Sequence, residues 1–257
     1  MLFCIGTGEP GAPAPAEGGG SVLRLLSNQN FNPTRLIVVS FGAIILLGTF
    51  LLHLPISARD GQFTPWLTCL FTATSATCVT GLVVQDTALY WSGFGQAVIL
   101  AMIQLGGLGF VSLISLIPLL LRRRIGLSQR LAIASAFNLN GMSGVVRVVR
   151  HALMGTFLLE GCGAILLATR FVPLFGWGRG LWYSIFHSVS AFCNAGFDLM
   201  GEHTGAFSSL AGFREDPVVL GTIGCLIVLG GLGFFVWEDC LEHRSWQRLS
   251  FYSRMVL

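Results

Sequence analysis

The sequence predicts an all-α polytopic membrane protein built from two repeated helix–pore-loop–helix units, with a pore architecture like that of voltage-gated channels. Of its 257 residues, 53% are hydrophobic and only 11% are charged, whereas soluble domains carry about 25% charged residues. Several apolar stretches are long enough to cross a bilayer. A short segment of mixed polarity also occurs twice, which indicates an internal duplication.

The duplicated segments are residues 71–82 and 186–197, which align without gaps. They share five identities: Phe71/Phe186, Ser75/Ser190, Ala76/Ala191, Cys78/Cys193 and Gly81/Gly196. An apolar segment with the pentapeptide Gly-Gly-Leu-Gly-Phe follows each copy, at residues 106–110 and 230–234. A repeat of short helix, glycine loop and long apolar helix is the layout of an ion pore.

The first unit begins with an apolar run of 19 residues, Leu36 to Leu54, enough to cross about 30 Å of hydrocarbon at about 1.5 Å per residue. Residues 64–77 are too short and too polar to span, so they fit a re-entrant pore helix. We expect Thr64 to cap this helix and Pro65 to be its first residue. Residues 94–121 form the next span, interrupted by the pentapeptide and Pro118.

The second unit repeats this plan, with a span over residues 151–173, a re-entrant helix over 181–193 and a span over 217–237. The predicted organisation of the whole chain is a disordered cytoplasmic leader (1–31), the first unit (32–121), a cytoplasmic arginine-rich connection (122–150), the second unit (151–237) and a cytoplasmic tail (238–257).

Charge predicts the orientation. All fifteen basic residues are arginines, and six of them lie between residues 122 and 150, where no acid occurs. By the positive-inside rule this connection faces the cytoplasm, so the N-terminus is cytoplasmic and both glycine loops open outward. Such clusters indicate membrane topology, and no nucleic-acid partner is expected. The seven cysteines form no CxxC pair, which disfavours a disulfide framework or zinc site.

The glycine loops carry the predicted chemistry. Backbone carbonyls in a narrow loop can replace the hydration shell of a cation without fixed charge, and non-helical backbone at membrane depth is tolerated where it lines a water-filled path. The predicted ion-binding residues are Thr77, Cys78, Val79, Thr80 and Gly81 in the first loop and Cys193, Asn194, Ala195 and Gly196 in the second. Ordinary tight turns are the alternative, which the duplication disfavours.

Three acidic residues have two readings each. Asp86 and Asp198 either concentrate cations at the pore mouth or are ordinary surface acids. Glu160 lies in the middle of a span, where a charge is costly, so we expect it to face the protein interior and to form a hydrogen bond or buried pair; the alternative is that it binds an ion. His187 is expected to be a packed, neutral histidine.

The first loop, residues 72–87, closely resembles the first selectivity filter of the Trk/Ktr/HKT superfamily of potassium transporters. Residues 190–199 resemble its second filter, and the two pentapeptides and residues 52–57 are also similar to that family. The resemblance runs from about Asn32 to the end of the chain and is strongest to the bacterial Trk/Ktr membrane subunit, of which this chain corresponds to the N-terminal half. In that family a glycine in the first filter accompanies potassium selectivity.

The resemblance implies potassium uptake across the plasma membrane, with potassium held by filter carbonyls, no tightly bound cofactor, no enzymatic activity, and sodium or proton coupling left open. It also implies a homodimer in membrane lipid and a cytoplasmic nucleotide-binding regulatory subunit. The family has four units in one chain and this sequence has two, so we expect a fragment of a four-unit transporter.

Two other functions remain open at this level. The chain could be a non-conducting half-pore that only assembles with a partner. A remote alternative is an intramembrane serine hydrolase, because residues 141–144 match a Gly-x-Ser-Gly pattern around Ser143 and His151 lies nearby. The serine falls in the predicted arginine-rich connection and outside any span, which disfavours this alternative.

Overall fold

The computed structural model describes residues 33–109, 145–233, 236–237, 239–240, 243 and 249–257. These residues belong to one compact unit, Pro33–Leu257. Their regular structure is helical apart from a single bridge between Ala58 and Trp91, so the all-α class is confirmed. The predicted leader, most of the arginine-rich connection and the Ser143 motif lie outside the described residues.

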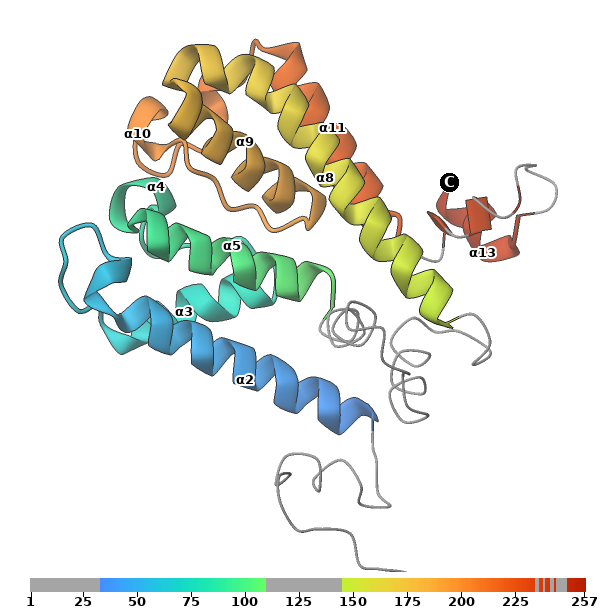
Figure 1. Ribbon diagram of the computed structural model, residues 1–257, viewed down its shortest axis with the longest axis horizontal. Helices are drawn as coiled ribbons and strands as arrows, with labels where there is room; N and C mark the ends of the chain where they lie inside the picture. Colours follow the sequence, from blue (N-terminus) through green and yellow to red (C-terminus); the bar gives the residue numbers. More distant parts are fainter. Residues whose placement is uncertain (1–32, 110–144, 234–235, 238, 241–242, 244–248) are drawn as a thin grey trace, which may run out of the picture. The chain divides into compact units, whose positions relative to one another are not determined.

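The first half of the chain contributes three packed helices, α2, α3 and α5 (Figure 1). The elements in chain order are α2 (Pro33–His53), the short 3₁₀ helix η1 (Pro55–Ser57), α3 (Trp66–Thr77), α4 (Thr87–Tyr90) and α5 (Gly93–Gly107).

The second half repeats this arrangement with α8, α9 and α11, which also contact one another. Its elements are α8 (Val145–Phe175), α9 (Trp177–Phe192), α10 (Gly201–Thr204), the 3₁₀ helix η2 (Ala211–Phe213) and α11 (Pro217–Gly231), and α13 (Phe251–Val256) follows. Helix α5 contacts α9, and α4 contacts α10, so the two halves touch at both places.

One close helix contact occurs at matching positions of the two halves. A Cβ on Gly48 of α2 would lie 2.1 Å from Met102 Sδ of α5. A Cβ on Gly163 of α8 would lie 2.6 Å from Leu226 Cδ1 of α11. Each glycine therefore lets the first long helix of its half approach the last one closely.

The start of α3 differs from the sequence prediction. The helix begins at Trp66, Pro65 occupies the N-cap position, and no side chain caps it. Thr64 is engaged elsewhere, because its hydroxyl accepts a hydrogen bond from Tyr90 Oη (3.1 Å) and its carbonyl lies 2.7 Å from His53 Nδ1. The expected capping role of Thr64 is therefore wrong.

Helix α9 begins four residues earlier than predicted, at Trp177. Gly176, with φ of 80°, is the only residue between α8 and α9. The absence of a side chain on Gly180 permits the tight turn, since a Cβ there would lie 2.6 Å from Val172 Cα. This close approach of α9 to α8 was not evident from periodicity.

The last long helix of each half ends within its Gly-Gly-Leu-Gly-Phe pentapeptide. Helix α5 ends at Gly107 and α11 at Gly231, and Gly109 and Gly233 follow with φ of 71° and 83°. Residues 110–121 of the predicted first-unit span lie outside the described part of the chain.

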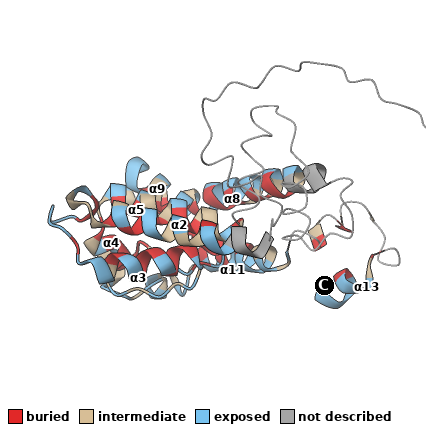
Figure 2. Cartoon of the chain, turned by 90° about the horizontal axis from the view of Figure 1, so that it is seen from below, coloured by how far each residue is buried: buried red, intermediate tan, exposed pale blue. Residues whose placement is uncertain are grey.

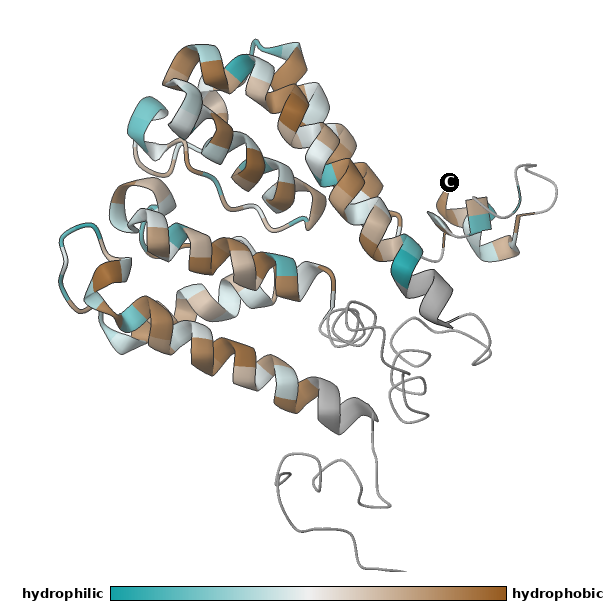
Figure 3. Cartoon of the chain, viewed as in Figure 1, coloured by the Kyte–Doolittle hydropathy of each residue, from teal (hydrophilic) through white to brown (hydrophobic). Residues whose placement is uncertain are grey.

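Large apolar side chains are exposed on α2 and α8, including Leu46, Leu47, Leu158 and Ile165, each more than 60% exposed. Figure 3 shows these helices as hydrophobic along much of their length, and Figure 2 shows exposed residues alternating with buried ones along α8. Within the described residues, the segment Arg150–Phe175 is long and apolar enough to cross a membrane, and three apolar helices are shorter: Val38–His53, Gly93–Gly107 and Pro217–Gly231. Such apolar surfaces suit contact with lipid.

Candidate functional site

The two predicted glycine loops follow α3 and α9 and have the same backbone conformation. Val79 and Asn194 occupy equivalent positions and both have φ of 57°. Gly81 and Gly196 are also equivalent and have φ of 72° and 73°. A β-branched residue such as valine rarely adopts positive φ, so the first loop carries strain of the kind found at functional sites.

The matched serines of the repeat hold these loops. The carbonyl of Ser75 accepts from Thr80 N (2.9 Å), and the carbonyl of Ser190 accepts from Ala195 N (2.7 Å). The Ser75 hydroxyl lies 2.9 Å from Thr80 Oγ1, and the Ser190 hydroxyl donates to Phe197 O (2.6 Å). The sequence identity at these two positions therefore reflects a shared role in fastening each loop to its helix.

The two loops meet at their glycines. A Cβ on Gly81 would lie 2.6 Å from Ala195 O and 3.3 Å from Gly196 Cα. A Cβ on Gly196 would lie 3.5 Å from Gly81 Cα. The structure thus brings together two loops that lie more than one hundred residues apart in the sequence.

The pentapeptides pack directly behind the loops. A Cβ on Gly106 would lie 2.0 Å from Thr77 O, and one on Gly230 would lie 1.8 Å from Phe192 O. Thr77 and Phe192 are the last residues of α3 and α9, and they occupy equivalent repeat positions. Glycine at these points allows α5 and α11 to lie against the ends of the short helices.

The described structure places the nine predicted ion-binding residues in two groups. Thr77 is the last residue of α3, is fully buried, and its hydroxyl has no hydrogen-bond partner there. Its carbonyl lies against Gly106, behind the loop. The remaining eight are Cys78, Val79, Thr80, Gly81, Cys193, Asn194, Ala195 and Gly196, which form the two loops. None of these side chains is charged, so their oxygen donors are neutral.

Asp86 does not present a free carboxylate. It is 8% exposed, and its Oδ1 accepts from Ala88 N and Leu89 N, both at 2.9 Å, so that it caps α4. Its Oδ2 accepts from Phe207 N (2.9 Å) in the second half. Asp86 is therefore a buried capping residue, which differs from both readings made from the sequence, a cation-concentrating acid and an ordinary surface acid.

Asp198 is half-buried beside the second loop. It accepts from Met200 N (3.0 Å) and from the Ser209 hydroxyl (3.3 Å). It also lines a cavity of about 220 Å³ together with Asn194 and Gly196. Of the two acids predicted at the mouth, Asp198 is the one that adjoins a loop.

Glu160 and His187 occur as expected. Glu160 is 5% exposed, and Gln104 Nε2 donates to its two carboxylate oxygens at 3.0 and 3.2 Å. His187 is 3% exposed, its Nε2 accepts from Leu199 N (3.3 Å), and its Nδ1 lies 2.7 Å from Tyr183 O. A ring that accepts at Nε2 and donates at Nδ1 is neutral.

A charged cluster around Glu202 of α10, at the start of α9, was missed in the sequence. Glu202 forms ion pairs with Arg59 of the first half and, at 3.6 Å, with Arg179 at the start of α9. Tyr183 Oη donates to Glu202 Oε2 (3.1 Å). Burial would raise the pKa of Glu202, but the hydrogen bond and charge of Arg59, with Tyr183 and Arg179, lower it below its usual value. No local sequence pattern links these distant residues.

Comparison with known proteins identifies the family. A family model described as a cation transport protein, TrkH, matches residues 26–256. The chain belongs to the TrkH family of cation transport proteins. The family resemblance seen in the sequence is thereby confirmed, and membership of a transport family agrees with the expectation that the chain is not an enzyme.

Individual members of this family give the same result. The chain is 38% identical over 237 residues to the potassium/sodium uptake protein NtpJ of Enterococcus hirae, covering 92% of this chain and 51% of the relative. It is 38% identical over 227 residues to the Ktr system potassium uptake protein B of Bacillus subtilis, covering 88% and 49%. It is 35% identical over 209 residues to the protein of that name in Vibrio alginolyticus, covering 81% and 44%. The chain spans about half the length of these curated relatives.

Proposed function

We propose that this chain forms half of the pore of a potassium uptake protein, and that potassium passes through a filter lined by backbone carbonyls of the two loops. The observation that carries the proposal is the meeting of Gly81 and Gly196, each at positive φ and each in a loop at the end of a short helix. Neutral carbonyl oxygens in such loops are the ligands expected for a dehydrated monovalent cation.

The family and the names of the relatives support potassium as the ion. We assign cation binding to the eight loop residues from Cys78 to Gly81 and from Cys193 to Gly196. The Thr77 carbonyl would join them only if the end of α3 moved away from Gly106, because that oxygen now lies against α5.

The finer organisation belongs to the same proposal. Each half is one membrane helix, one re-entrant pore helix with its loop and one further membrane helix, with the units bounded at residues 32–121 and 151–237. In this proposal the N-terminus, the connection 122–150 and the tail 238–257 are cytoplasmic, and the loops open outward in the plasma membrane. Sodium or proton coupling is compatible with this arrangement.

Two partners are included in the proposal. The relatives in Bacillus subtilis are named as proteins B and D of a Ktr system, which supports a system of several components. The cytoplasmic nucleotide-binding regulatory subunit that we include is an expectation from the family resemblance. The exposed apolar side chains of α2 and α8 would contact membrane lipid. The homodimer remains an expectation from the family resemblance.

Potassium uptake tests the proposal. The full-length gene product would be expressed in cells that lack their own potassium importers, and growth and rubidium uptake would be measured at limiting potassium, with membrane abundance determined in parallel. Growth rescue that Gly81→Ser impairs and Ser143→Ala leaves intact is expected. Rescue that depends on Ser143 and is indifferent to Gly81 would overturn the pore in favour of hydrolase chemistry. An inserted protein without uptake would favour a non-conducting assembly partner.

A further inference from the structure

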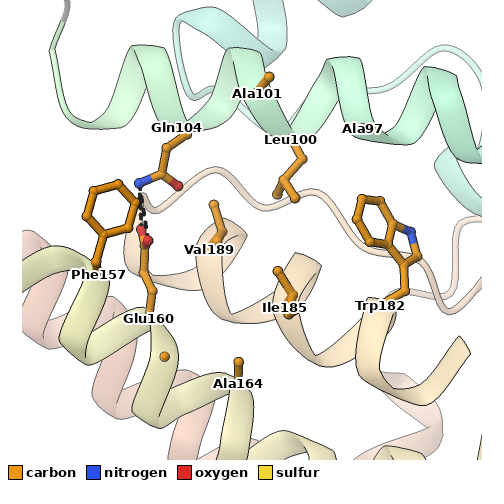
Figure 4. A pocket seen from close by; sticks show the side chains of 11 residues that line it. Ala97, Leu100, Ala101, Gln104, Phe157, Glu160, Ala164, Trp182, Ile185 and Val189 are labelled. Atoms are coloured by element: carbon orange, nitrogen blue, oxygen red, sulfur yellow. Dashed lines mark hydrogen bonds between the residues drawn. The ribbon is translucent and has the colours of Figure 1, made fainter. Parts of the chain in front are cut away.

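Glu160 connects the two halves of the protein beside the second loop. It lies on α8, and its carboxylate accepts from Gln104 Nε2 on α5 at 3.0 and 3.2 Å. Figure 4 shows the two side chains pointing toward each other at one end of a cavity of about 540 Å³ with otherwise mainly apolar walls. In such surroundings a hydrogen bond to a carboxylate is strong, and an unmade one is costly.

The same residue also contacts α9 and the loop that follows it. Cys193 Sγ donates to Glu160 Oε1 (3.9 Å), and the Ser188 hydroxyl donates to the Glu160 carbonyl (2.6 Å). A Cβ on Gly107 of α5 would lie 2.5 Å from Cys193 Sγ. Cys193, the first residue of the second loop, is therefore confined between α5 and Glu160.

The first loop lacks this support in the described structure. The repeat spacing that pairs Gly48 with Gly163 pairs Ile45 with Glu160 and Cys78 with Cys193. Isoleucine cannot accept a hydrogen bond, and Cys78 is exposed whereas Cys193 is half-buried. Of the two matching positions, only that in the second half carries an acid. It lies in a helix segment that is apolar enough to cross a membrane, where an acid is disfavoured.

Nothing else in the described residues neutralises Glu160. No arginine or histidine there forms an ion pair with it, and its side-chain partners are Gln104 and Cys193. One of these partners, Cys193, is the residue at which the second loop begins.

We propose that Glu160 is a positioning residue that sets the register of the second loop through Cys193, and that the preference for potassium over sodium depends on the Gln104–Glu160 bridge. This inference rests on the proposed function. Removing the bridge allows Cys193 to move, and the carbonyls from Cys193 to Gly196 move with it. The ion site that these carbonyls line then no longer discriminates potassium from sodium by size.

Selectivity in the full-length protein tests this inference. Potassium and sodium uptake would be compared for wild type, Glu160→Ala and the exchange variant Gln104→Glu/Glu160→Gln, which retains one carboxylate, one amide and an acceptor for Cys193. We expect Glu160→Ala to reduce the potassium-to-sodium ratio about tenfold, equivalent to about 1.4 kcal/mol. We expect the exchange variant to recover most of that ratio.

Gln96→Ala is the matched control. Gln96 also lies on α5 and also bridges to the second half, since its Oε1 accepts from Trp182 Nε1 of α9 (2.9 Å), but it does not contact a loop residue. We expect this variant to lower the amount of folded protein and to leave the ion ratio unchanged. An equal loss of selectivity in Gln96→Ala would show that any weakening between α5 and the second half suffices, and would overturn the specific role of Glu160.

A second readout does not need transport. The alkylation rate of Cys193 in purified protein would be measured by mass spectrometry of its peptide after N-ethylmaleimide treatment, with exposed Cys78 as internal reference. Glu160→Ala should raise the alkylation rate of Cys193 several-fold relative to that of Cys78, and the exchange variant should lower the Cys193 rate again. Wild-type alkylation together with a wild-type ion ratio in Glu160→Ala would overturn the inference. If no variant carries potassium, the proposed function fails while alkylation still reports the positioning.

Discussion

Gly81 and Gly196 are in backbone contact: the Cβ that any other residue would place at position 81 lies 3.3 Å from Gly196 Cα and 2.6 Å from Ala195 O. Both glycines also have φ near 70°, where a side chain is strained. Two independent constraints, space and backbone conformation, therefore exclude other residues at position 81. At position 196 the backbone conformation is the stronger constraint.

Substituting either glycine should weaken ion discrimination. We expect Gly81→Ser to reduce the potassium-to-sodium ratio about tenfold or more, because the serine must displace the second loop, and Gly196→Ser to reduce it less. The measurement is competitive uptake of the two ions at equal membrane abundance.

Gly61→Ser is the control that separates the effect of backbone strain from the effect of a place in the loops. Gly61 has φ of 68°, but no atom lies within 4 Å of its Cβ position. We expect a cost of about 1 kcal/mol in stability from the backbone conformation and no change in ion preference. Unaltered selectivity in both loop variants would refute the filter assignment.

The pentapeptide glycines should be essential for packing. Gly106→Ala and Gly230→Ala would place a methyl carbon 2.0 and 1.8 Å from a helix carbonyl oxygen, far closer than van der Waals contact allows. We expect a loss of at least about 1–3 kcal/mol in stability and a lower thermal unfolding midpoint in detergent.

Gly224→Ala provides the comparison on α11, where no atom lies within 4 Å of the Cβ position. This variant should be neutral or gain up to about 1 kcal/mol, since alanine favours helix over glycine. Similar behaviour of Gly224→Ala and Gly230→Ala would contradict the close approach to α9.

Glu202 should make stability depend on acid pH. Its pKa is lower in the folded protein, mainly because Arg59 outweighs the effect of burial, so the ionised form stabilises the fold. That contribution is complete above the unfolded pKa, about 4.3, and disappears as pH falls through the lower folded pKa. Thermal midpoints of wild type and Glu202→Gln, measured from pH 7 downward, should therefore converge as the pH falls below the unfolded pKa. A constant difference would rule out this ion cluster as the cause.

Asp86→Ala should reduce stability and leave the potassium affinity of the remaining folded protein unchanged. The substitution removes the N-cap of α4 and leaves the Phe207 amide without its acceptor, which together cost about 1–3 kcal/mol. Asp60→Ala, which removes a bond only to nearby Gln62, should have little effect. A raised half-saturation constant for potassium in Asp86→Ala would instead support a role at the pore mouth.

The fold class, the loops and the family were predictable because they depend on local patterns. Hydrophobic runs and the serine, cysteine and glycine identities repeat at fixed spacing, and the chain repeats the same backbone conformations at Val79 and Asn194. The partners of the buried polar groups were not predictable. Thr64 resembles a helix cap in sequence, but Tyr90, 26 residues away, occupies its hydroxyl.

The same limit applies to the acids. Asp86 follows a loop in sequence and so suggested a pore mouth, yet its second oxygen is taken by an amide 121 residues away. The contact between Gln104 and Glu160 was not predictable either, because α5 belongs to the first half and α8 to the second. Contacts between halves arise from their packing, which a single sequence does not encode as a local pattern.

The confinement of Cys193 between Gly107 and Glu160 has a consequence for biosynthesis. Part of the surface around Cys193 comes from α5, which precedes it by more than eighty residues in the chain. The second loop can therefore reach its packed position only against a helix that the ribosome synthesises before it. A defect in the insertion of α5 would accordingly disturb a loop that is translated much later.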